Sequence, residues 1–357
     1  MHFLRLILFP FSILYGLFMM IRNLLFDFRV LPVERFSIPV IGVGNLTLGG
    51  TGKTPHIEYI IRLLTPKYFI GTLSRGYGRK SNGFIIASKR SQAKYIGDEP
   101  LQFAKKFDGI KVAVDENRKH GIQLLIEKYP SLDVILLDDS FQHRFVKPSL
   151  SILLTDFHHL YSEDFLLPTG TLREFRSGAK RADLIIVTKT PKIFSPITRR
   201  RILEEIKPRP HQTVLFSYIK YGVPVPFFDY PQPVFPEKVT NILLITGIAY
   251  PDPLTEHLQR ICSDLTLMKF PDHHYFTEKD IVLMIKQFND LLSKNKVIIT
   301  TEKDFMRLKT PVLSNFLKNL PLFYLPIEIE FHGDNKETFN HFILNHVEQY
   351  TRNKNIS

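Results

Sequence analysis

Residues 44–54 have the types and spacing of a phosphate-binding loop, reading Gly-Asn-Leu-Thr-Leu-Gly-Gly-Thr-Gly-Lys-Thr. Glycines let successive backbone N–H groups converge on phosphate oxygens, a lysine meets the charge of the β- and γ-phosphates, and a hydroxyl ligates Mg²⁺. Lys53 and Thr54 supply the last two groups, while Thr47 stands where the strict pattern has glycine. The alternative is an ordinary glycine-rich turn with a surface lysine. We expect ATP to bind along the loop, at Thr47, Leu48, Gly49, Gly50, Thr51, Gly52, Lys53 and Thr54.

A second candidate site follows the apolar residues 134–137, which lead into Asp138 and Asp139. Carboxylates at the end of a strand beside a phosphate loop are typical of residues that hold Mg²⁺ and its water shell. Many strands end in aspartate, so this pair indicates a metal or substrate site only in combination with the loop. Residues 140–143 form a polar turn, at the edge where ligands of open α/β sheets bind.

Three further clusters place charged residues in turns. Arg75 lies in a glycine-rich loop and suits bidentate phosphate recognition. Asp98 and Glu99 begin a predicted helix, where the alternative function of Asp98 is that of an N-cap. Arg173 and Glu174 follow a Pro-Thr-Gly turn, and the alternative there is a solvated ion pair.

Residues 270–274, Phe-Pro-Asp-His-His, place an acid beside two histidines. Consecutive positions rarely point at one ion, so we discount a zinc site. Residues 300–304 have the pattern of a helix start capped by threonine.

The elements that must position these groups alternate between strand and helix. Helical patterns cover residues 54–64, 99–107 and 117–129. Continuous Val/Ile/Leu runs, typical of strands buried on both faces, cover residues 38–44, 68–74, 110–115, 133–139, 150–156 and 183–189. This alternation predicts an α/β domain with a doubly wound, mainly parallel sheet, similar to P-loop NTPases.

Seven prolines between residues 208 and 236 indicate a connector, because proline is excluded from helix interiors and central strands. Strand and helix patterns resume after it and predict a second, smaller α/β domain. The predicted divisions are an N-terminal apolar helix at residues 1–30, a P-loop domain at residues 31–207, the connector at residues 208–236 and the smaller domain at residues 237–357.

The N-terminus carries an uncharged apolar run, residues 6–21, between Arg5 and Arg22. A helix of this length spans ~24 Å, whereas crossing a bilayer takes ~20 residues. No small-residue cleavage site follows the run, which argues against a secretory signal peptide; a buried core helix is the other alternative. The flanking arginines, Pro10 and Gly16 favour membrane attachment, as a short span or as a helix in the interface.

The chain has 357 residues, a net charge of +12 and one cysteine, Cys262. Its composition excludes a disordered tail and a polytopic membrane protein, and its length allows two domains. The single cysteine excludes a disulfide framework and a cysteine-cluster metal site. The charge indicates an anionic partner, and composition alone leaves nucleic acid, a membrane and a phosphorylated small molecule open.

The motifs, taken in order, resemble those of the tetraacyldisaccharide 4'-kinase family, the membrane-associated enzymes of lipid A biosynthesis. Ser140 is a departure, because the family usually has glycine there. The resemblance runs nearly end to end and comprises the apolar N-terminus and residues 44–55, 74–79, 97–100, 138–143, 166–174, 188–189, 246–251, 270–273 and 301–304.

The resemblance implies transfer of the γ-phosphoryl group of ATP to the 4'-hydroxyl of a tetraacylated glucosamine disaccharide 1-phosphate, forming lipid IVA. It implies that Asp98 is the base for this hydroxyl, that His273 orients and tunes it, and that Lys53 completes the catalytic set. The implied Mg²⁺ ligands are Thr54, Asp138, Asp139 and Glu99, with Glu174 as an alternative. The implied contacts to nucleotide or lipid are Arg75, Arg118, Arg173 and Glu174.

The same resemblance implies a monomer at the cytoplasmic face of a bacterial inner membrane, whose smaller domain closes over the larger one. The implied partners are the lipid A disaccharide precursor and an anionic membrane surface, and not nucleic acid. One alternative is a membrane-recruited P-loop ATPase of the partitioning type, but those attach through a C-terminal amphipathic helix and this tail is polar. The other is a basic nucleic-acid-binding protein, for which the chain has no recognisable module.

Overall fold

The computed structural model describes residues 2–228, 234–272 and 274–354, and the chain divides into two compact units. Unit 1 comprises Met1–Ile219 and Ile329–Ser357, and unit 2 comprises Lys220–Glu328. Each unit has a sheet of its own.

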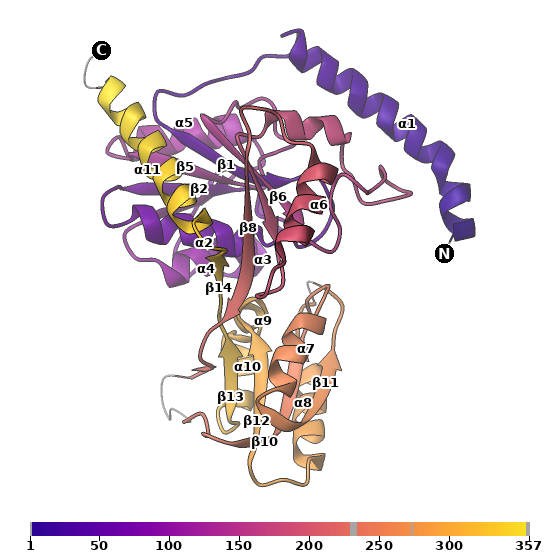
Figure 1. Ribbon diagram of the computed structural model, residues 1–357. Helices are drawn as coiled ribbons and strands as arrows, with labels where there is room; N and C mark the ends of the chain where they lie inside the picture. Colours follow the sequence, from indigo (N-terminus) through magenta and orange to yellow (C-terminus); the bar gives the residue numbers. More distant parts are fainter. Residues whose placement is uncertain (1, 229–233, 273, 355–357) are drawn as a thin grey trace. The chain divides into compact units, whose positions relative to one another are not determined.

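Unit 1 contains a nine-stranded sheet in the order β14-β8-β7-β6-β1-β5-β2-β4-β3 (Figure 1). Its central strands pair in parallel, and β3 pairs antiparallel with β4. Val43 lies opposite Asp138 in the register, so the chain leaves β1 and β5 at the same edge of the sheet. The strands are β1 (Val40–Asn45), β2 (Ile70–Ser74), β3 (Ile85–Ala87), β4 (Lys111–Val114), β5 (Val134–Asp138), β6 (Leu150–Asp156), β7 (Leu184–Thr188), β8 (Thr213–Tyr221) and β14 (Ile327–Phe331).

Every residue of β1, β2, β5 and β7 is buried, so this sheet is covered on both faces and its strands are continuous apolar runs. One core cluster packs α5 residues such as Ile122 and Leu125 against Ile135 and Leu137 of β5. Another packs Ile202 and other α6 residues against the β6 and β7 side. The helices of unit 1 are α1 (His2–Asp27), α2 (Lys53–Leu64), α3 (Ala93–Ile96), α4 (Asp98–Lys106), α5 (Arg118–Lys128), the 3₁₀ helix η1 (Arg176–Arg181), α6 (Pro196–Ile206) and α11 (Asn335–Lys354).

Unit 2 contains a five-stranded sheet in the order β11-β10-β12-β13-β9. Its strands pair in parallel except for β9, which is antiparallel to β13 at the edge. The strands are β9 (Val225–Pro226), β10 (Val239–Thr246), β11 (Cys262–Lys269), β12 (Lys296–Thr301) and β13 (Leu322–Leu325), and the helices are α7 (Asp252–Gln259), α8 (Glu278–Asp290), α9 (Glu302–Leu308) and α10 (Pro311–Leu317).

The predicted fold class is confirmed: both sheets are mainly parallel α/β sheets, and the apolar N-terminus is a helix. The predicted boundaries differ from the compact units. The expected connector contains β8, because no proline interrupts residues 211–223, and Pro226 lies in an edge strand, where the missing N–H is tolerated. The expected C-terminal domain is also too long, because β14 joins the larger sheet and α11 belongs to unit 1.

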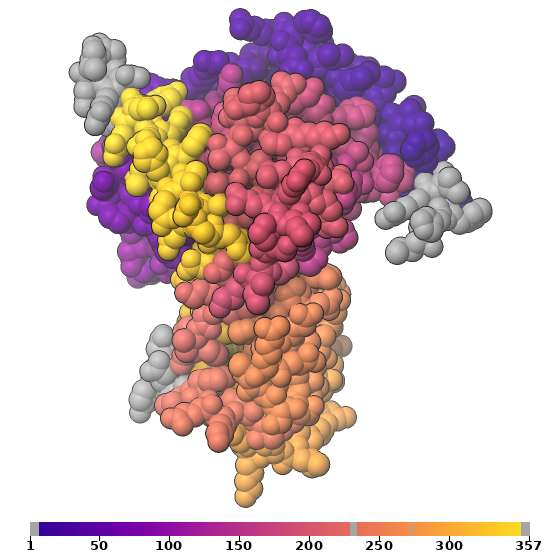
Figure 2. Space-filling model, in the orientation of Figure 1, coloured from indigo at the N-terminus to yellow at the C-terminus, as the bar shows by residue number. Residues whose placement is uncertain are grey.

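Helix α1 is longer than the apolar run that predicts it. It continues through Arg22 and Asn23 to Asp27, and the stretch Ile7–Asp27 is long and apolar enough to cross a membrane by length and composition. Figure 2 shows α1 in indigo along the outer side of unit 1. Large apolar side chains remain exposed along it, among them Leu14 and Phe18, each 65% exposed.

Candidate active site

The phosphate-binding loop joins β1 to α2 at the carboxyl edge of the unit 1 sheet. Gly49 and Gly52 adopt positive φ angles of 110° and 84°, which non-glycine residues adopt only with strain. A Cβ at Gly49 would meet no atom within 4 Å, so its backbone conformation, and not lack of space, requires glycine there. The strand–loop–helix order predicted for residues 44–54 is therefore present.

The loop is tied to neighbouring segments on both sides. The Thr188 hydroxyl donates to the carbonyl of Thr51 at 2.9 Å, and the amide of Leu48 donates to the carbonyl of Thr171 at 2.7 Å. Thr47 forms a β-bridge with Leu172. Within the described part of the chain, the buried Thr51 hydroxyl has no hydrogen-bond partner.

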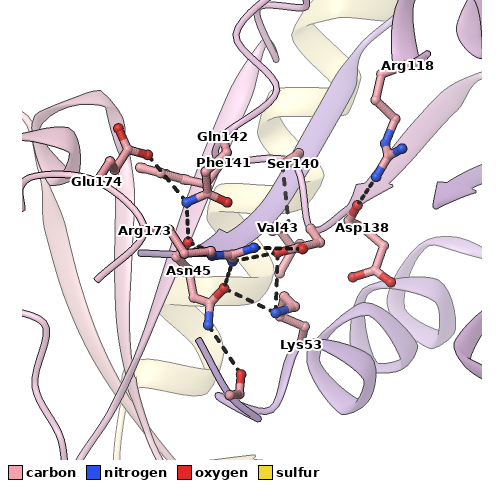
Figure 3. A network of polar contacts seen from close by, with 12 residues as sticks. Val43, Asn45, Lys53, Arg118, Asp138, Ser140, Phe141, Gln142, Arg173 and Glu174 are labelled. Carbon is pink, nitrogen blue, oxygen red and sulfur yellow. Dashed lines mark hydrogen bonds and ion pairs between the residues drawn. The ribbon is translucent and has the colours of Figure 1, made fainter. Parts of the chain in front are cut away.

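Lys53 is the first residue of α2, and its ammonium lies between two oxygens. Nζ donates to Asn45 Oδ1 at 3.1 Å and pairs with Asp139 Oδ1 at 3.3 Å. Arg173 reaches the same two residues: its guanidinium forms two hydrogen bonds with the Asp139 carboxylate, at 2.8 and 3.0 Å, and also bonds the Asn45 side chain. Figure 3 shows Asn45, Lys53 and Arg173 turned toward one another. Two cations thus converge on one carboxylate beside the loop.

Burial would raise the pKa of Asp139, but hydrogen bonds from Arg173 and the charge of Lys53 outweigh burial and hold this pKa below its ordinary value. The backbone of Asp139 has φ 50°, in the left-handed region that aspartate tolerates better than most residues. The turn after β5 therefore aims the carboxylate at the loop, and Asp139 is ionised across the physiological range.

Asp138 has the opposite environment. Burial, together with the charge of Glu99, raises its pKa to about 7. Its Oδ1 is buried and has no hydrogen-bond partner among the described residues. A carboxylate oxygen without a donor, close to a second acid, fits a cation that would replace the missing donor.

These residues fit Mg²⁺. Carboxylate and hydroxyl oxygens are its preferred ligands, and it is commonly held by one or two carboxylates together with substrate phosphates and water. Asp138, Asp139 and Thr54 lie at the ends of β5 and the start of α2, on one edge. No group of three or more His, Cys, Asp or Glu side chains that could hold a metal lies within the described ranges.

Arg118, expected to contact phosphate or lipid, lies at the start of α5 and is buried. It donates to the carbonyls of Asp115 at 2.7 Å and Asp138 at 3.2 Å, as Figure 3 shows for the second bond. Burial lowers its pKa to about 10, so it stays charged. One of its donors therefore supports the end of β5 and another supports the turn after β4, while its Nε has no partner among the described residues.

Asp98 and Glu99 form the first turn of α4, and Asp98 is buried. Gly97, with φ 93°, occupies the N-cap position, so the N-cap alternative for Asp98 is wrong. A Cβ on Gly97 would lie 3.0 Å from Gly76 Cα, which shows that the 97–100 turn packs on the turn after β2. Arg75, in that second turn, is exposed, and its charge acts on Arg118 and His143. The acids of α4 and Arg75 thus lie on adjacent turns.

Glu174 lies in a different setting from the metal candidates. Its carboxylate is 1% exposed and accepts hydrogen bonds from Arg181 at 2.8 Å, Asn23 at 3.2 Å and Gln142 at 3.3 Å. These donors occupy both of its oxygens. The structure thus brings Glu174 together with α1 and the turn after β5.

His273, the predicted partner of Asp98, lies outside the described residues. Its neighbours in unit 2 are described: His274 stacks on Phe270 and pairs with Asp280 at 3.0 Å. Thr301 caps α9 by accepting from the Asp304 amide at 3.0 Å, so the predicted helix start is confirmed.

Two polar residues of the site were not among the predicted site residues. Asn45 joins Lys53 to Arg173, and Gln142 donates to the Asn45 carbonyl at 2.9 Å. Both follow apolar strands at the carboxyl edge, and this position is the signal that could have identified them.

A cavity of about 1170 Å³ opens in unit 1 beside the turn after β5. It is lined by Ser140, Phe141 and His143 from that turn, and by the segment that follows α1. Burial and then the charge of Arg118 lower the pKa of His143 to about 4, so this imidazole is neutral at physiological pH. The cationic side chains of the lining are Arg29, Arg35, Arg144, Lys147, Lys180 and Arg181.

Residues 4–348 match the family model described as tetraacyldisaccharide-1-P 4'-kinase. Two relatives named tetraacyldisaccharide 4'-kinase are similar over their whole length. The one from Bacteroides thetaiotaomicron is 46% identical, covering 100% of this chain and 97% of the relative, and the one from Flavobacterium psychrophilum is 49% identical, covering 99% and 100%. A crystal structure of "apo" form LpxK from Aquifex aeolicus in complex with ATP superposes with a TM-score of 0.72 at 26% identity, covering 96% of this chain and 99% of that one.

Proposed function

The chain belongs to the tetraacyldisaccharide-1-P 4'-kinase family, and from that premise we propose how its residues divide the work of phosphoryl transfer. The enzyme transfers the γ-phosphoryl group of ATP to the 4'-hydroxyl of the lipid A precursor. The observation that carries the assignment of residues is the convergence of Lys53 and Arg173 on Asp139 beside the glycine-rich loop.

The loop residues 47–54 hold the phosphates of ATP through their backbone N–H groups. Lys53 exchanges its contacts with Asn45 and Asp139 for the β- and γ-phosphates, and Arg173 neutralises charge on the same side. Positioning and charge neutralisation account for most of the catalysis of phosphoryl transfer. When bound, Mg²⁺ neutralises phosphate charge, and Thr54, Asp138, Asp139 and Glu99 are its proposed ligands.

Asp98 is the proposed base. The 4'-oxygen attacks the γ-phosphorus, the bond from this phosphorus to the bridging oxygen breaks, ADP leaves, and the hydroxyl proton passes to the Asp98 carboxylate. His273 orients this base, as the family resemblance implies, and the smaller domain closes over the larger one. A buried carboxylate on the turn next to Arg75 supports the assignment of Asp98.

The cationic cavity beside the turn after β5 is the proposed location of the sugar-phosphate end of the lipid. Six cationic side chains, together with the apolar Leu31, Pro32 and Val33 of the segment after α1, match a substrate with phosphate at one end and acyl chains beyond it. Arg75 follows β2 at the same carboxyl edge of the sheet and is proposed to add a further contact.

Helix α1 is the proposed membrane element, at the cytoplasmic face of the inner membrane. Its inner side contacts unit 1 along the described length and its outer side is apolar, which favours a helix in the interface over a span. That the enzyme is a monomer and does not bind nucleic acid stays a prediction.

A transfer assay with γ-labelled ATP and a monophosphorylated tetraacyl disaccharide tests the function and the site together. Wild type should form labelled lipid, whereas Lys53→Ala should form far less of it and should lose ATP affinity. Lys67→Ala, an exposed lysine beyond the same helix, is the matched control and should act as wild type. Release of ADP without labelled lipid would favour the partitioning-type ATPase, and neither product would favour the nucleic-acid-binding alternative.

A further inference from the structure

The side of α1 that faces unit 1 carries four hydrogen-bonding side chains beside the buried Met19 and Phe26, which is unusual for an apolar helix. The side chains of Ser12, Tyr15, Arg22 and Asn23, at helical spacing, all form hydrogen bonds with residues more than 100 positions away. Between them, Gly16 allows close approach, since a Cβ there would lie 2.8 Å from Leu166 Cδ1. The helix is therefore seated on unit 1 in one register by directed contacts.

These contacts end on the segments that build the phosphoryl-transfer site. The Tyr15 hydroxyl donates to the carbonyl of Arg173 at 2.7 Å. Arg22 donates to the carbonyl of Gln142 at 3.0 Å, and the Asn23 amide donates to Glu174 at 3.2 Å. All three acceptors belong to the turn after β5 or to the Arg173–Glu174 pair.

The same segments contact the loop on their other side. Arg173 reaches Asp139 and Asn45 through its guanidinium, and its backbone amide donates to the carbonyl of Leu46 at 2.8 Å. Gln142 bridges the Asn45 carbonyl and Glu174. The turn after β5 and the Arg173–Glu174 pair thus lie between α1 and the phosphate-binding loop, and each forms hydrogen bonds with both.

Glu174 lies between α1 and the loop, and because its carboxylate is buried it depends on the protein for its hydrogen-bond donors. Glu174 is 1% exposed and charged groups surround it, including Arg181 and, through α1, Arg22. The Asn23 amide donates to Glu174 Oε2, and a buried acceptor that loses its donor costs free energy, which favours a rearrangement of the segment that carries it. Arg173 is the adjacent residue, so such a movement displaces the guanidinium from Asp139.

We propose that Tyr15 and Asn23 of α1 are positioning residues for the kinase site: by holding the Arg173 carbonyl and the Glu174 carboxylate, they keep the Arg173 guanidinium on Asp139 beside the loop. In this account α1 does more than attach the enzyme to a surface. The inference rests on the kinase activity and on contacts within unit 1, and it holds whether or not α1 binds a membrane.

The test compares two donor deletions with a matched control on the same helix. Tyr15→Phe and Asn23→Leu, alone and together, are assayed in the full-length protein with saturating lipid. We expect the double variant to lower kcat about tenfold and to raise the KM for ATP, because small displacements of a positioning group have large effects on rate. Leu24→Ala, on the exposed side of α1 and outside the lining of the cationic cavity, should leave both constants unchanged. Asn23→Gln, which keeps the amide donor, should recover part of the loss.

A merely structural contribution is separated by repeating the series with Arg173→Lys. If Tyr15 and Asn23 act through the guanidinium, their substitutions should cost little in this background. Effects that add fully to that of Arg173→Lys, or an unchanged KM for ATP, would overturn the proposal. If the double variant fails to fold by thermal melting, Tyr15→Phe alone, which keeps the ring, carries the same test.

Membrane attachment is measured separately, by sedimentation with vesicles that contain anionic phospholipid. Phe18→Ser, on the exposed side of α1, should weaken sedimentation, whereas Tyr15→Phe and Asn23→Leu should not. Unchanged sedimentation of Phe18→Ser with the vesicles would refute the membrane proposal and would leave the positioning proposal intact. Loss of kcat in proportion to lost sedimentation would refute the positioning proposal.

Discussion

A buried aspartate lies at the carboxyl edge of each sheet, and the two aspartates differ in how fully they are hydrogen-bonded. In unit 2, Asp304 accepts from the Gly247 amide at 2.9 Å and the Thr301 hydroxyl at 2.7 Å, and it pairs with the buried Arg307 at 3.0 Å. In unit 1, Asp138 keeps one buried oxygen without a donor among the described residues, and its pKa is raised to about 7. Full satisfaction is typical of a scaffold, whereas an unsatisfied acid at a loop that binds phosphate is typical of a ligand site.

The same contrast extends to the cations. Arg307 in unit 2 holds Asp304 and the Gly247 carbonyl, which fixes the turn after β10. Lys53 in unit 1 is about one-fifth exposed and shares Asp139 with Arg173. An ion pair with solvent access on the carboxyl edge can exchange partners when phosphate arrives, whereas a fully buried pair cannot do so without leaving a buried charge uncompensated.

The largest expected effect tests the carboxyl edge of the unit 1 sheet, where Lys53 has access to solvent. Lys53→Ala should lower kcat/KM by about 10³-fold, since it removes a preorganised charge at the transferred phosphoryl group. Thermal stability should change little, because the ammonium is partly exposed. Steady-state kinetics and calorimetric melting measure the two effects. A large loss of stability with wild-type turnover would show that Lys53 supports the fold and does not bind ligand, contrary to the comparison.

The next effect concerns the base. Asp98→Asn should lower kcat on the lipid by about 10²-fold, the usual contribution of a positioned base, with ATP affinity largely kept. His273→Ala should have an effect of similar size if the two residues work together. Single-turnover transfer and equilibrium ATP binding separate the two quantities, and normal turnover of His273→Ala would contradict the pairing.

Breaking the buried Asp304–Arg307 pair of unit 2 should change the stability of the protein. Asp304→Ala should destabilise unit 2 by about 3–5 kcal/mol, because it leaves the buried Arg307 without its partner. Asp290→Ala, at the exposed end of α8, is the matched control and should change stability by less than about 0.5 kcal/mol. Chemical unfolding followed by circular dichroism gives both values. Equal changes in unfolding free energy for Asp304→Ala and Asp290→Ala would show that the buried pair does not stabilise unit 2.

The smallest effect depends on pH. The pKa of Asp138 is raised in the folded state, so its ionisation costs stability as pH rises from about 4 to about 7, and the full cost is present above pH 7. Asp138→Asn should therefore melt at a higher temperature than wild type at pH 8, by about 2–4 °C for each kcal/mol relieved, and near the wild-type temperature at pH 4.5.

Asp139→Asn is the contrasting variant for that experiment. The pKa of Asp139 is held below its ordinary value by Arg173 and Lys53, so its stabilisation is present above pH 4 and is lost only in stronger acid. The variant should be less stable than wild type at both pH 4.5 and pH 8. Identical pH profiles for the two variants would contradict the assigned environments.

Much of the fold could be predicted because each strand of a parallel sheet is buried on both faces. The run at residues 133–139 contains β5, and the run at residues 183–189 contains β7. The loop at residues 44–54 could be predicted because glycine and lysine spacing is a local property. Residues 208–236 misled the prediction because local proline content does not reveal that residues 213–221 form β8 in the larger sheet.

The sequence by itself determined the strand–loop–helix that we propose binds phosphate, the acids at the end of β5, the apolar character of α1 and the order of motifs that identifies the family. These depend on residue type and spacing along the chain. Only the tertiary structure decided that Arg173 and Lys53 share Asp139 and that Glu174 contacts α1. It also decided that one buried oxygen of Asp138 has no donor among the described residues, whereas Asp304 has donors. Such relations join residues up to 151 positions apart, and they follow from how strands and turns pack, which spacing along the chain does not specify.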